Sequence, residues 1–417
     1  MRFHKLRDVI LNKIGIKIRL RIVCLWYLIS LMVETRKHSM RSASELSGLC
    51  ISSFSKFLRN NKDIAVYTLR DLSKKQAKIY SEVLEKAAEL PWHIFILIDS
   101  TIQGRSGLKS ENVQRFNHGK GFVIGHQWTN ILLIFNGIII PLPPIPFYTK
   151  TYCREYGLTY MTEHEKLVGY LDRLNLYEHV GFHDDENVVV LTDSGYDSRK
   201  IQNAVLSRGW HFVGALKSTR GIKSEAGYAK TPKSSGWDGT EIFFKKYRKL
   251  AWKTVRILTD GPKKKRKEFR IRHAEVFLNG VGKIRAVCSE FKRKRDGRRK
   301  YIACSDLKAT PRQILIAYRL RWKIEIFHKH VKMHLGFEDV AAKHFSSVES
   351  HVSLVYCAYI LLNAGLPGVG TGGTVLEKQR RVAKILENKK TACAIHDLTK
   401  IGGVEKYKSQ LKSALAA

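Results

Sequence analysis

The chain has 417 residues, of which 44% are hydrophobic and 27% are charged, and its formal net charge at pH 7 is +37. This length is sufficient for two or three domains with cores of their own. The apolar content is ordinary for a globular protein, so a disordered chain is not the default interpretation. A net charge so far from zero favours a polyanionic partner, and nucleic acid is a stronger candidate than an anionic membrane surface.

Residues 1–88 are predicted to be helical, because apolar residues recur there at helical spacing. The longest apolar run, Ile22–Val33, is too short to span a bilayer, and we expect it to be a buried helix. Ser42–Leu58 resembles a helix-turn-helix with Gly48 near its turn, although two short helices of any bundle give a similar pattern. We therefore expect a helical DNA-binding region over residues 1–88.

The seven cysteines are scattered, odd in number and without a Cys-x-x-Cys pair, which argues against a disulfide framework and a zinc ribbon. The pattern indicates a reducing compartment, and we expect a cytoplasmic protein associated with the nucleoid. From Pro262 to Lys300 the chain has 16 Lys or Arg against four acidic residues. A phosphate-binding surface and a pair of solvated hairpin loops both fit that run.

From residue 92 the pattern changes to that of strands. Continuous apolar runs predict strands covered on both faces, and Asn136-Gly137 predicts a hairpin turn. The predicted strands are 93–98, 131–135, 138–142, 187–191 and 211–216, and the predicted helices are 161–175, 198–208 and 311–335. The class is α/β, and the order of these elements is similar to that of the ribonuclease H-like fold.

Between the strand predicted at 211–216 and the helix predicted at 311–335, further strand-like segments indicate a β-rich insertion subdomain over residues 221–310. The core would then consist of residues 89–220 and be completed by 311–340. A helical C-terminal region is expected over residues 341–417.

Four residues near the end of the predicted core, Tyr318, Arg321, Glu325 and Lys332, follow one another at spacings of 3, 4 and 7. At about 100° per residue, all four project from one narrow stripe of an α-helix. A carboxylate flanked by Arg and Lys suits a metal-assisted reaction on a phosphodiester, because the cations hold phosphates while the carboxylate holds the metal. The pattern requires carboxylate partners from elsewhere.

Asp99 and Asp193 are the candidate partners, because each ends a buried run of β-type residues and is followed by small or polar residues. Either one alone would more often start a turn. Together with Glu325, they provide three hard oxygen ligands, which suit two Mg²⁺ ions at an in-line phosphoryl displacement. Asp197 is a nearby rival, but its position at a helix start favours an N-terminal capping role.

Three histidines, His328, His330 and His334, lie on the same predicted helix. His330 and His334 have the i, i+4 spacing of a transition-metal pair, but no third ligand is evident in the sequence. We interpret all three as imidazoles that face solvent or DNA.

The pattern Y-x2-R-x3-E-x6-K, with Asp99-Ser-Thr and Asp193-Ser-Gly-Tyr upstream, resembles the DDE transposases of the insertion sequence four type over residues 92–340. The resemblance implies a ribonuclease H-like catalytic core with a β-strand insertion between the second and third acidic residues. It also implies that Asp99, Asp193 and Glu325 are the ligands of two Mg²⁺ ions, for which Mn²⁺ substitutes.

By the same resemblance, Tyr318, Arg321 and Lys332 would hold phosphates of the transposon end around a distorted or flipped nucleotide. Family members that form a DNA hairpin stack a Trp of the insertion on that base. Trp237 and Trp252 are the candidates here, and each fits an ordinary core position equally well.

The implied function is that of a DNA transposase, which cleaves at the ends of its element and joins the 3′-hydroxyls to target DNA. Its partner would be double-stranded DNA, both the terminal inverted repeats and the target, bound by a dimer. The alternatives are a nuclease of the same fold without strand transfer, and a basic DNA-binding protein derived from a transposase that has lost its chemistry.

Overall fold

The computed structural model describes residues 18–33, 37–81, 89–118, 121–181, 183–230, 236–247, 250–258, 266–292 and 299–400. The chain divides into two compact units: unit 1 comprises residues 1–72 and 330–417, and unit 2 comprises residues 73–329. Parts of the predicted helices and of the predicted basic surface, at 1–17, 82–88, 259–265, 293–298 and 401–417, lie outside the described residues.

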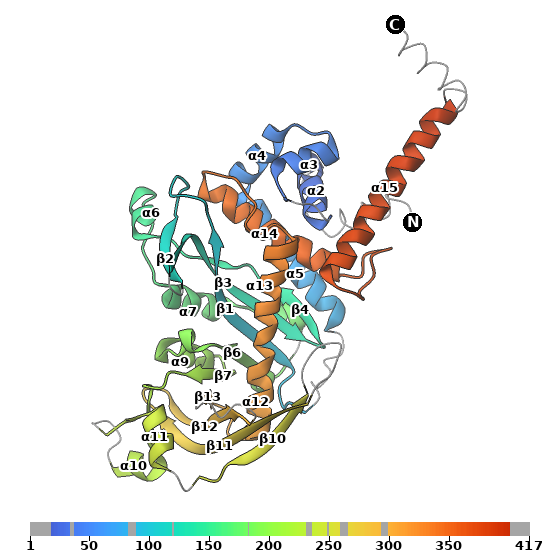
Figure 1. Ribbon diagram of the computed structural model, residues 1–417. Coiled ribbons are helices and arrows are strands. Elements are labelled where there is room, and N and C mark those ends of the chain that lie inside the picture. Colours follow the sequence, from blue (N-terminus) through green and yellow to red (C-terminus); the bar gives the residue numbers. More distant parts are fainter. Residues whose placement is uncertain are drawn as a thin grey trace. The chain divides into compact units, whose positions relative to one another are not determined.

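Unit 2 is built on one mixed sheet, whose described part has 13 strands in the main order β2-β3-β1-β6-β7-β13-β12-β11-β8-β9 (Figure 1). β4 and β5 also pair with β3, and β10 pairs with β11. The strands are β1 Ile94–Gly104, β2 Gln114–His118, β3 Gly121–Phe135, β4 Ile138–Pro141, β5 Ile145–Pro146, β6 Val188–Thr192, β7 His211–Leu216, β8 Gly221–Ser224, β9 Asp238–Gly239, β10 Lys253–Leu258, β11 Arg266–Leu278, β12 Gly282–Phe291 and β13 Arg299–Cys304.

Helices of unit 2 connect these strands. They are α6 Lys150–Glu155, α7 Glu163–Arg173, α8 Tyr177–Val180, α9 Arg199–Ser207, α10 Glu225–Lys230, α11 Thr240–Lys246 and α12 Pro311–Leu320, with 3-10 turns η1 Asp185–Asn187 and η2 Ser194–Tyr196. Unit 1 contains α2 Ile18–Met32, α3 Met40–Ser47, α4 Ile51–Asn60, α14 Phe345–Asn363 and α15 Val375–Lys400. α5 Lys62–Tyr80 and α13 Trp322–His334 contribute residues to both units.

The centre of the sheet is parallel: β1 pairs with β6, and β6 pairs with β7. β3 runs antiparallel to β1 on the other side. The residues of β1 up to Ile98 and all residues of β6 are buried, because both faces of the sheet are covered. These elements confirm the predicted α/β class, the central strands and the hairpin at Asn136-Gly137.

The four strands predicted between residues 221 and 310 are also present, as β10 to β13. β13 pairs with β7 from Tyr301↔Leu216 to Cys304↔Val213, so these strands continue the central sheet and do not form a separate one. The region expected as an insertion therefore extends the same sheet outward from β7.

The helix predicted over 311–335 is two helices. α12 begins at Pro311 after a capping box, in which Thr310 and Gln313 satisfy each other's backbone N–H groups. At Arg321 the hydrogen bonds change to the tighter i→i+3 pattern, from Arg321 N–H to Tyr318 O and from Ile324 N–H to Arg321 O. The backbone of Arg321 stays right-handed, at φ −50° and ψ −32°, so α13 follows α12 without reversing direction.

In unit 1, α14 is the central helix and packs against α2 and α4. α14 is the one described helix long and apolar enough to cross a bilayer, and 94% of its apolar window is buried within the structure. Burial of this degree is typical of the core helix of a globular protein. α2 is buried over most of Ile22–Val33, as predicted.

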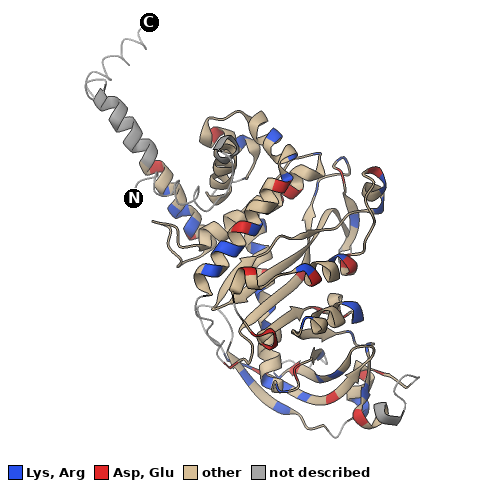
Figure 2. Ribbon diagram, turned by 180° about the vertical axis from the view of Figure 1, so that it is seen from behind, with Lys and Arg blue, Asp and Glu red and all other residues tan. Residues whose placement is uncertain are grey.

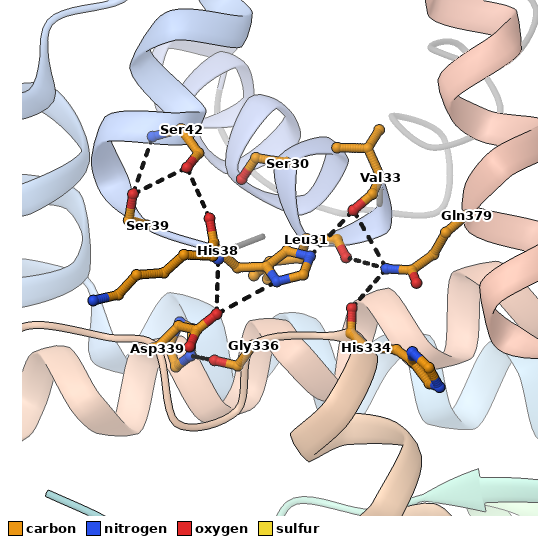
Figure 3. Close-up of polar contacts among 12 residues, drawn as sticks. Ser30, Leu31, Val33, His38, Ser39, Ser42, His334, Gly336, Asp339 and Gln379 are labelled. Carbon is orange, nitrogen blue, oxygen red and sulfur yellow. Dashed lines mark hydrogen bonds and ion pairs between the residues drawn. The ribbon is translucent and has the colours of Figure 1, made fainter. Parts of the chain in front are cut away.

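Buried polar side chains join distant segments of unit 1 (Figure 3). Asp339 accepts a hydrogen bond from the backbone N–H of His38 at 2.7 Å, and the His38 Nε2 atom lies 3.1 Å from the carbonyl oxygen of Val33. The Gln379 amide nitrogen donates to the carbonyl of His334 at 2.7 Å. Together these bonds fasten the end of α2 to the turn that follows α13 and to α15.

Candidate active site

The first two acidic residues are placed by strand register. The last residue pair of the parallel β1–β6 ladder is Ile98↔Thr192. Asp99 and Asp193 come next on the two neighbouring strands, so both carboxylates emerge where the parallel ladder ends. β6 ends there, as predicted for Asp193, whereas β1 continues past Asp99 to Gly104 in its pairing with β3.

The third acidic residue is brought to Asp99 by α13. The Arg321 Nη1 atom lies 3.2 Å from Glu325 Oε1 and 3.7 Å from Asp99 Oδ2, so one guanidinium bridges the two carboxylates. The Arg321 side chain is only 10% exposed, which strengthens its electrostatic interactions. Two acidic residues more than two hundred positions apart thus share one cation.

The surroundings of Asp99 disfavour its ionised form, because other carboxylates lie nearby. Burial raises the pKa of Asp99 to about 7, and the neighbouring Glu325 and Asp193 add to the rise. Arg321 and the backbone N–H of Ser100 lower it, but they do not compensate. A divalent cation would relieve such crowding of carboxylates, so the site fits a metal ion on electrostatic grounds.

Asp193 follows the end of β6 and lies near Asp99 and Arg321. Its carboxylate accepts a hydrogen bond from the backbone N–H of Ser194 and interacts electrostatically with Tyr318 and Arg321. Among the described residues, the group whose ligand atoms all lie within 4.8 Å of one another is Asp99, Glu325 and His328, and it does not include Asp193. The structure thus groups Asp99 with Glu325 most closely, with Asp193 beside them.

The interpretation of His328 as a solvent- or DNA-facing residue is wrong. His328 is 8% exposed, and its Nε2 atom lies 2.8 Å from the side-chain nitrogen of Asn130, which is fully buried on β3. His330 is half-buried, and its ring lies 6.4 Å from that of Tyr359 and 6.2 Å from that of His334, measured between centroids. His328 is the one of the three that belongs to the carboxylate group.

The expected capping role of Asp197 is also wrong. The N-cap of α9 is Ser198. The buried Asp197 carboxylate accepts hydrogen bonds from the Lys217 N–H at 2.9 Å and from Gln202 at 3.2 Å, and it lies 3.4 Å from Arg220 Nε. Asp197 therefore fixes the end of β7 and is not part of the group formed by Asp99, Glu325 and His328.

A buried hydrogen-bond network holds the loop after Asp193. The Tyr196 hydroxyl donates to Glu163 Oε1 at 2.6 Å, and the same carboxylate accepts from Thr129 at 2.8 Å and from Gln127 at 2.8 Å. Tyr196 also hydrogen-bonds the side chain of Ser100, the neighbour of Asp99. Glu163 was not predicted from the sequence, where its only local signal is the capping box formed by the residues around it.

A hollow of about 750 Å³ lies beside the acidic residues of unit 2. Its most exposed aromatic residue is Trp322, at 62%, which immediately follows Arg321. Cationic side chains from α12, α13, β11 and β13 surround it, and no acidic residue lines it. The lining residues are Ile139, Lys267, Lys300, Tyr318, Arg319, Arg321, Trp322, Lys323 and Ile326. Figure 2 shows Lys and Arg along the strands of this part of the sheet.

The two candidate tryptophans of the insertion lie away from this hollow. Trp237 adjoins β9 and packs against Lys223 of β8, which pairs with β11 only at Val276–Leu278, whereas the β11 residue that lines the hollow is Lys267, nine residues before Val276. Trp252 is covered by the guanidinium groups of Arg270 and Arg272, at 4.9 and 4.7 Å from its ring, and by Arg299. Neighbouring strand residues point to opposite faces, so Arg299 and Lys300 place Trp252 and the hollow on opposite faces of the sheet.

Unit 1 contains two short consecutive helices where the helix-turn-helix was predicted. α3 ends at Gly48, whose φ of 75° requires glycine's freedom, and α4 begins at Ile51. Phe54, Phe57 and Leu58 of α4 are buried. Among its exposed residues, Ser52, Ser55, Lys56 and Arg59 have the spacing of one helical face, and α4 contains no acidic residue.

Lys332 lies near the end of α13 in unit 1, where its Nζ atom pairs with Glu338 at 3.2 Å. Its side chain is about one-third exposed.

Comparison with known proteins agrees with this geometry. Residues 166–361 match the family model for the transposase DDE domain. This span includes Asp193 and Glu325 and begins after Asp99. No curated protein matches the chain. The family match supports a DDE transposase.

Proposed function

We propose that the protein is a DNA transposase of the insertion sequence four type with a ribonuclease H-like core. The observation that carries the proposal is the meeting of Asp99 and Glu325 on one guanidinium, with Asp193 placed beside Asp99 by strand register. The sheet order β4-β3-β1-β6-β7, antiparallel up to β1 and parallel from β1 onward, supports the ribonuclease H-like core.

In this proposal Asp99, Asp193 and Glu325 hold divalent metal, Mg²⁺ or Mn²⁺. The bound metal would activate the attacking water or 3′-hydroxyl and stabilise the leaving oxygen, as in two-metal phosphoryl transfer. Asp99 is central, because it interacts electrostatically with both other carboxylates. The strands and α13 fix the three ligands on rigid elements, which preorganises the reaction geometry.

The hollow beside Arg321 would hold the end of the element. Lys267, Lys300 and Lys323 supply positive charge for phosphates, and the exposed ring of Trp322 supplies a face on which a base can stack. Trp322 takes the place that the sequence analysis considered for Trp237 or Trp252. Tyr318, Arg321 and Lys332 remain the proposed phosphate contacts of the Y-R-E-K pattern.

The α3–α4 unit would read the terminal repeats. Its second helix presents Lys56 and Arg59 together with the hydroxyls of Ser52 and Ser55, which suit phosphate and base-edge contacts in a major groove. Replacing Lys56 and Arg59 by Ala should weaken binding to the repeats and lower its salt dependence. Cleavage of ends supplied at saturating concentration should change much less.

The decisive experiment incubates purified protein with DNA that carries the sequences flanking its coding region, in Mg²⁺ or Mn²⁺. The wild-type protein should nick at the repeat ends, and Glu325→Gln should bind the same DNA without cutting it. If Glu325→Gln still cuts, the assignment of the catalytic carboxylates is wrong. If the wild-type protein binds but never nicks in either metal, it is a DNA-binding protein without the chemistry.

The alternative of a nuclease without strand transfer is tested by supplying precut ends with free 3′-hydroxyls and a plasmid target. A transposase joins them into the plasmid, whereas a simple nuclease gives no joined product. Cross-linking in the presence of paired ends would test the proposed dimer on DNA.

A further inference from the structure

We propose that His328 is a nitrogen ligand of the divalent metal that Asp99 and Glu325 bind, which gives this site a preference for Mn²⁺ over Mg²⁺. The inference rests on the proposed metal-dependent function. It adds a residue that the acidic signature does not include, and it predicts which ions the site accepts.

The geometry of the three side chains carries the inference. A ligand atom of His328 lies within 4.8 Å of carboxylate oxygens of both Asp99 and Glu325. Glu325 and His328 are three residues apart on α13, so both side chains project from one face of the helix. A Glu-x-x-His pair on a helix supplies one carboxylate and one imidazole to a metal in di-iron and di-manganese bundle proteins.

Asn130 provides the outer support that a metal-bound histidine requires. The Asn130 side chain is fully buried and lies 2.8 Å from the Nε2 atom of His328. Rotation of the amide by half a turn exchanges its oxygen and nitrogen, so Asn130 can accept the Nε2–H, which leaves the lone pair of Nδ1 for the cation. Such outer-shell bonds fix the ring orientation and tautomer of metal-ligating histidines.

The strand register places Asn130 beside Asp99 in the sheet. Asn130 and Asp99 are direct cross-strand partners in the β3–β1 pair, so their side chains lie on the same face. The strand that presents Asp99 is therefore paired with the strand that holds the ring of His328. Asn130 thus contacts His328 of α13 and pairs with Asp99 of β1, and it connects the proposed ligands of the helix and the sheet.

The chemistry of a mixed oxygen and nitrogen set predicts the ion preference. Mg²⁺ favours oxygen ligands and keeps its waters, whereas imidazole suits transition metals, and affinity rises from Mn²⁺ through Co²⁺ and Ni²⁺. A site with His328 should bind Mn²⁺ more tightly than Mg²⁺, and Ni²⁺ should compete with Mn²⁺.

Pulsed electron paramagnetic resonance of Mn²⁺ bound to the full-length protein tests the ligand directly, without relying on activity. The wild-type protein should show nitrogen hyperfine coupling on the bound ion. His328→Asn should remove that coupling and weaken Mn²⁺ binding at least about tenfold. The same change should weaken Mg²⁺ binding much less.

The matched control is the double variant His330→Asn and His334→Asn, which removes the other two imidazoles of α13. Its nitrogen coupling should equal that of the wild-type protein. Circular dichroism of each variant shows whether it is folded. If His328→Asn is unfolded, the resonance spectrum of the wild-type protein still tests whether a nitrogen binds the metal.

Two results separate the inference from the function on which it rests. Carboxylate-dependent Mn²⁺ binding without nitrogen coupling in the wild-type protein overturns the role of His328 and leaves the proposed transposase intact. If Asp99→Asn and Glu325→Gln do not change Mn²⁺ binding, the proposed metal site itself is wrong.

Discussion

The Nη1 atom of Arg321 lies 3.2 Å from the Oε1 atom of Glu325, one helical turn further along α13. The same nitrogen is 3.7 Å from Asp99, so this guanidinium offsets the repulsion between two half-buried carboxylates. In the proposed reaction Arg321 also contacts DNA phosphate, and its role in the fold can be measured separately from that contact.

Replacing Arg321 by Ala should lower the free energy of unfolding by about 1.5–3 kcal/mol, because hydrogen bonds to charged groups contribute that much. Added Mn²⁺ should restore part of the loss, since a cation then takes over the charge balance. Thermal or urea unfolding with and without metal measures both effects.

The control for this prediction is Arg312→Ala, which removes an exposed ion pair with Glu89. Exposed pairs contribute about 0–1 kcal/mol, so this variant should be close to wild type and insensitive to metal. Equal losses in the two variants would contradict the bridging role of Arg321.

Glu163 and Tyr196 should act as a positioning pair. Glu163→Gln places an amide among three hydrogen-bond donors, and Tyr196→Phe removes one of those donors. Each change should reduce the rate of DNA cleavage and raise the Mn²⁺ concentration required, while binding of the terminal DNA is unchanged.

The two changes should also be non-additive, because they break one hydrogen bond. A double-mutant cycle on cleavage rate and metal requirement measures the coupling. Additive effects, or a loss of DNA binding that parallels the loss of cleavage, would show that the pair only supports the fold.

Replacing Asp197 should lower the stability of the protein without changing its affinity for metal. Asp197→Asn weakens the bonds to Lys217 N–H and Arg220, and we expect a loss of about 1–3 kcal/mol in the free energy of unfolding. Its Mn²⁺ affinity, measured below its melting temperature, should match that of wild type. Asp99→Asn should show the opposite pattern, and a fall in Mn²⁺ affinity for Asp197→Asn would restore it as a rival ligand.

His126 should make stability depend on pH. Burial, with a smaller contribution from Arg105, lowers the pKa of His126 to about 4, although its bond to the Glu111 carbonyl opposes the shift. Below about pH 6.5 the unfolded chain gains a proton that the folded chain does not, so stability falls as the pH falls towards 4. The contribution is at most about 3 kcal/mol.

Unfolding of His126→Gln between pH 4 and pH 8 checks this contribution, with pH values chosen to span about two units on each side of the ordinary histidine pKa. The variant should lose less stability on acidification than the wild-type protein. Parallel curves for the two proteins would show that His126 has an ordinary pKa in the fold.

The sequence predicted the elements whose signals are local. The buried runs before Asp99 and Asp193 have the length and composition of central strands, and the spacing of Arg321 and Glu325 depends only on helical periodicity. That Asp99 and Asp193 are neighbours follows from parallel pairing, which the order of the elements also indicated.

The residues that sequence reasoning misplaced depend on contacts between distant segments. His328 is buried because Asn130, 198 residues earlier, lies beside it. Asp197 has the spacing of a helix cap, but Lys217 and Arg220 of the next strand and turn bind it instead. Trp322, four residues after Tyr318, falls on the polar side of the predicted helix, but only contacts with the distant Lys267 and Lys300 place it at a basic hollow.

The pairing of Ile98 with Thr192 makes the candidate active site sensitive to the length of β1 before Asp99. Inserting one residue there would turn the carboxylate to the opposite face of the sheet, because side chains alternate along a strand. Inserting two residues would restore the face but displace the carboxylate by about 6.6 Å along the strand. A change in the length of β1 before Asp99 therefore alters the face or the level of this carboxylate relative to Asp193, whereas a substitution there leaves the strand register unchanged.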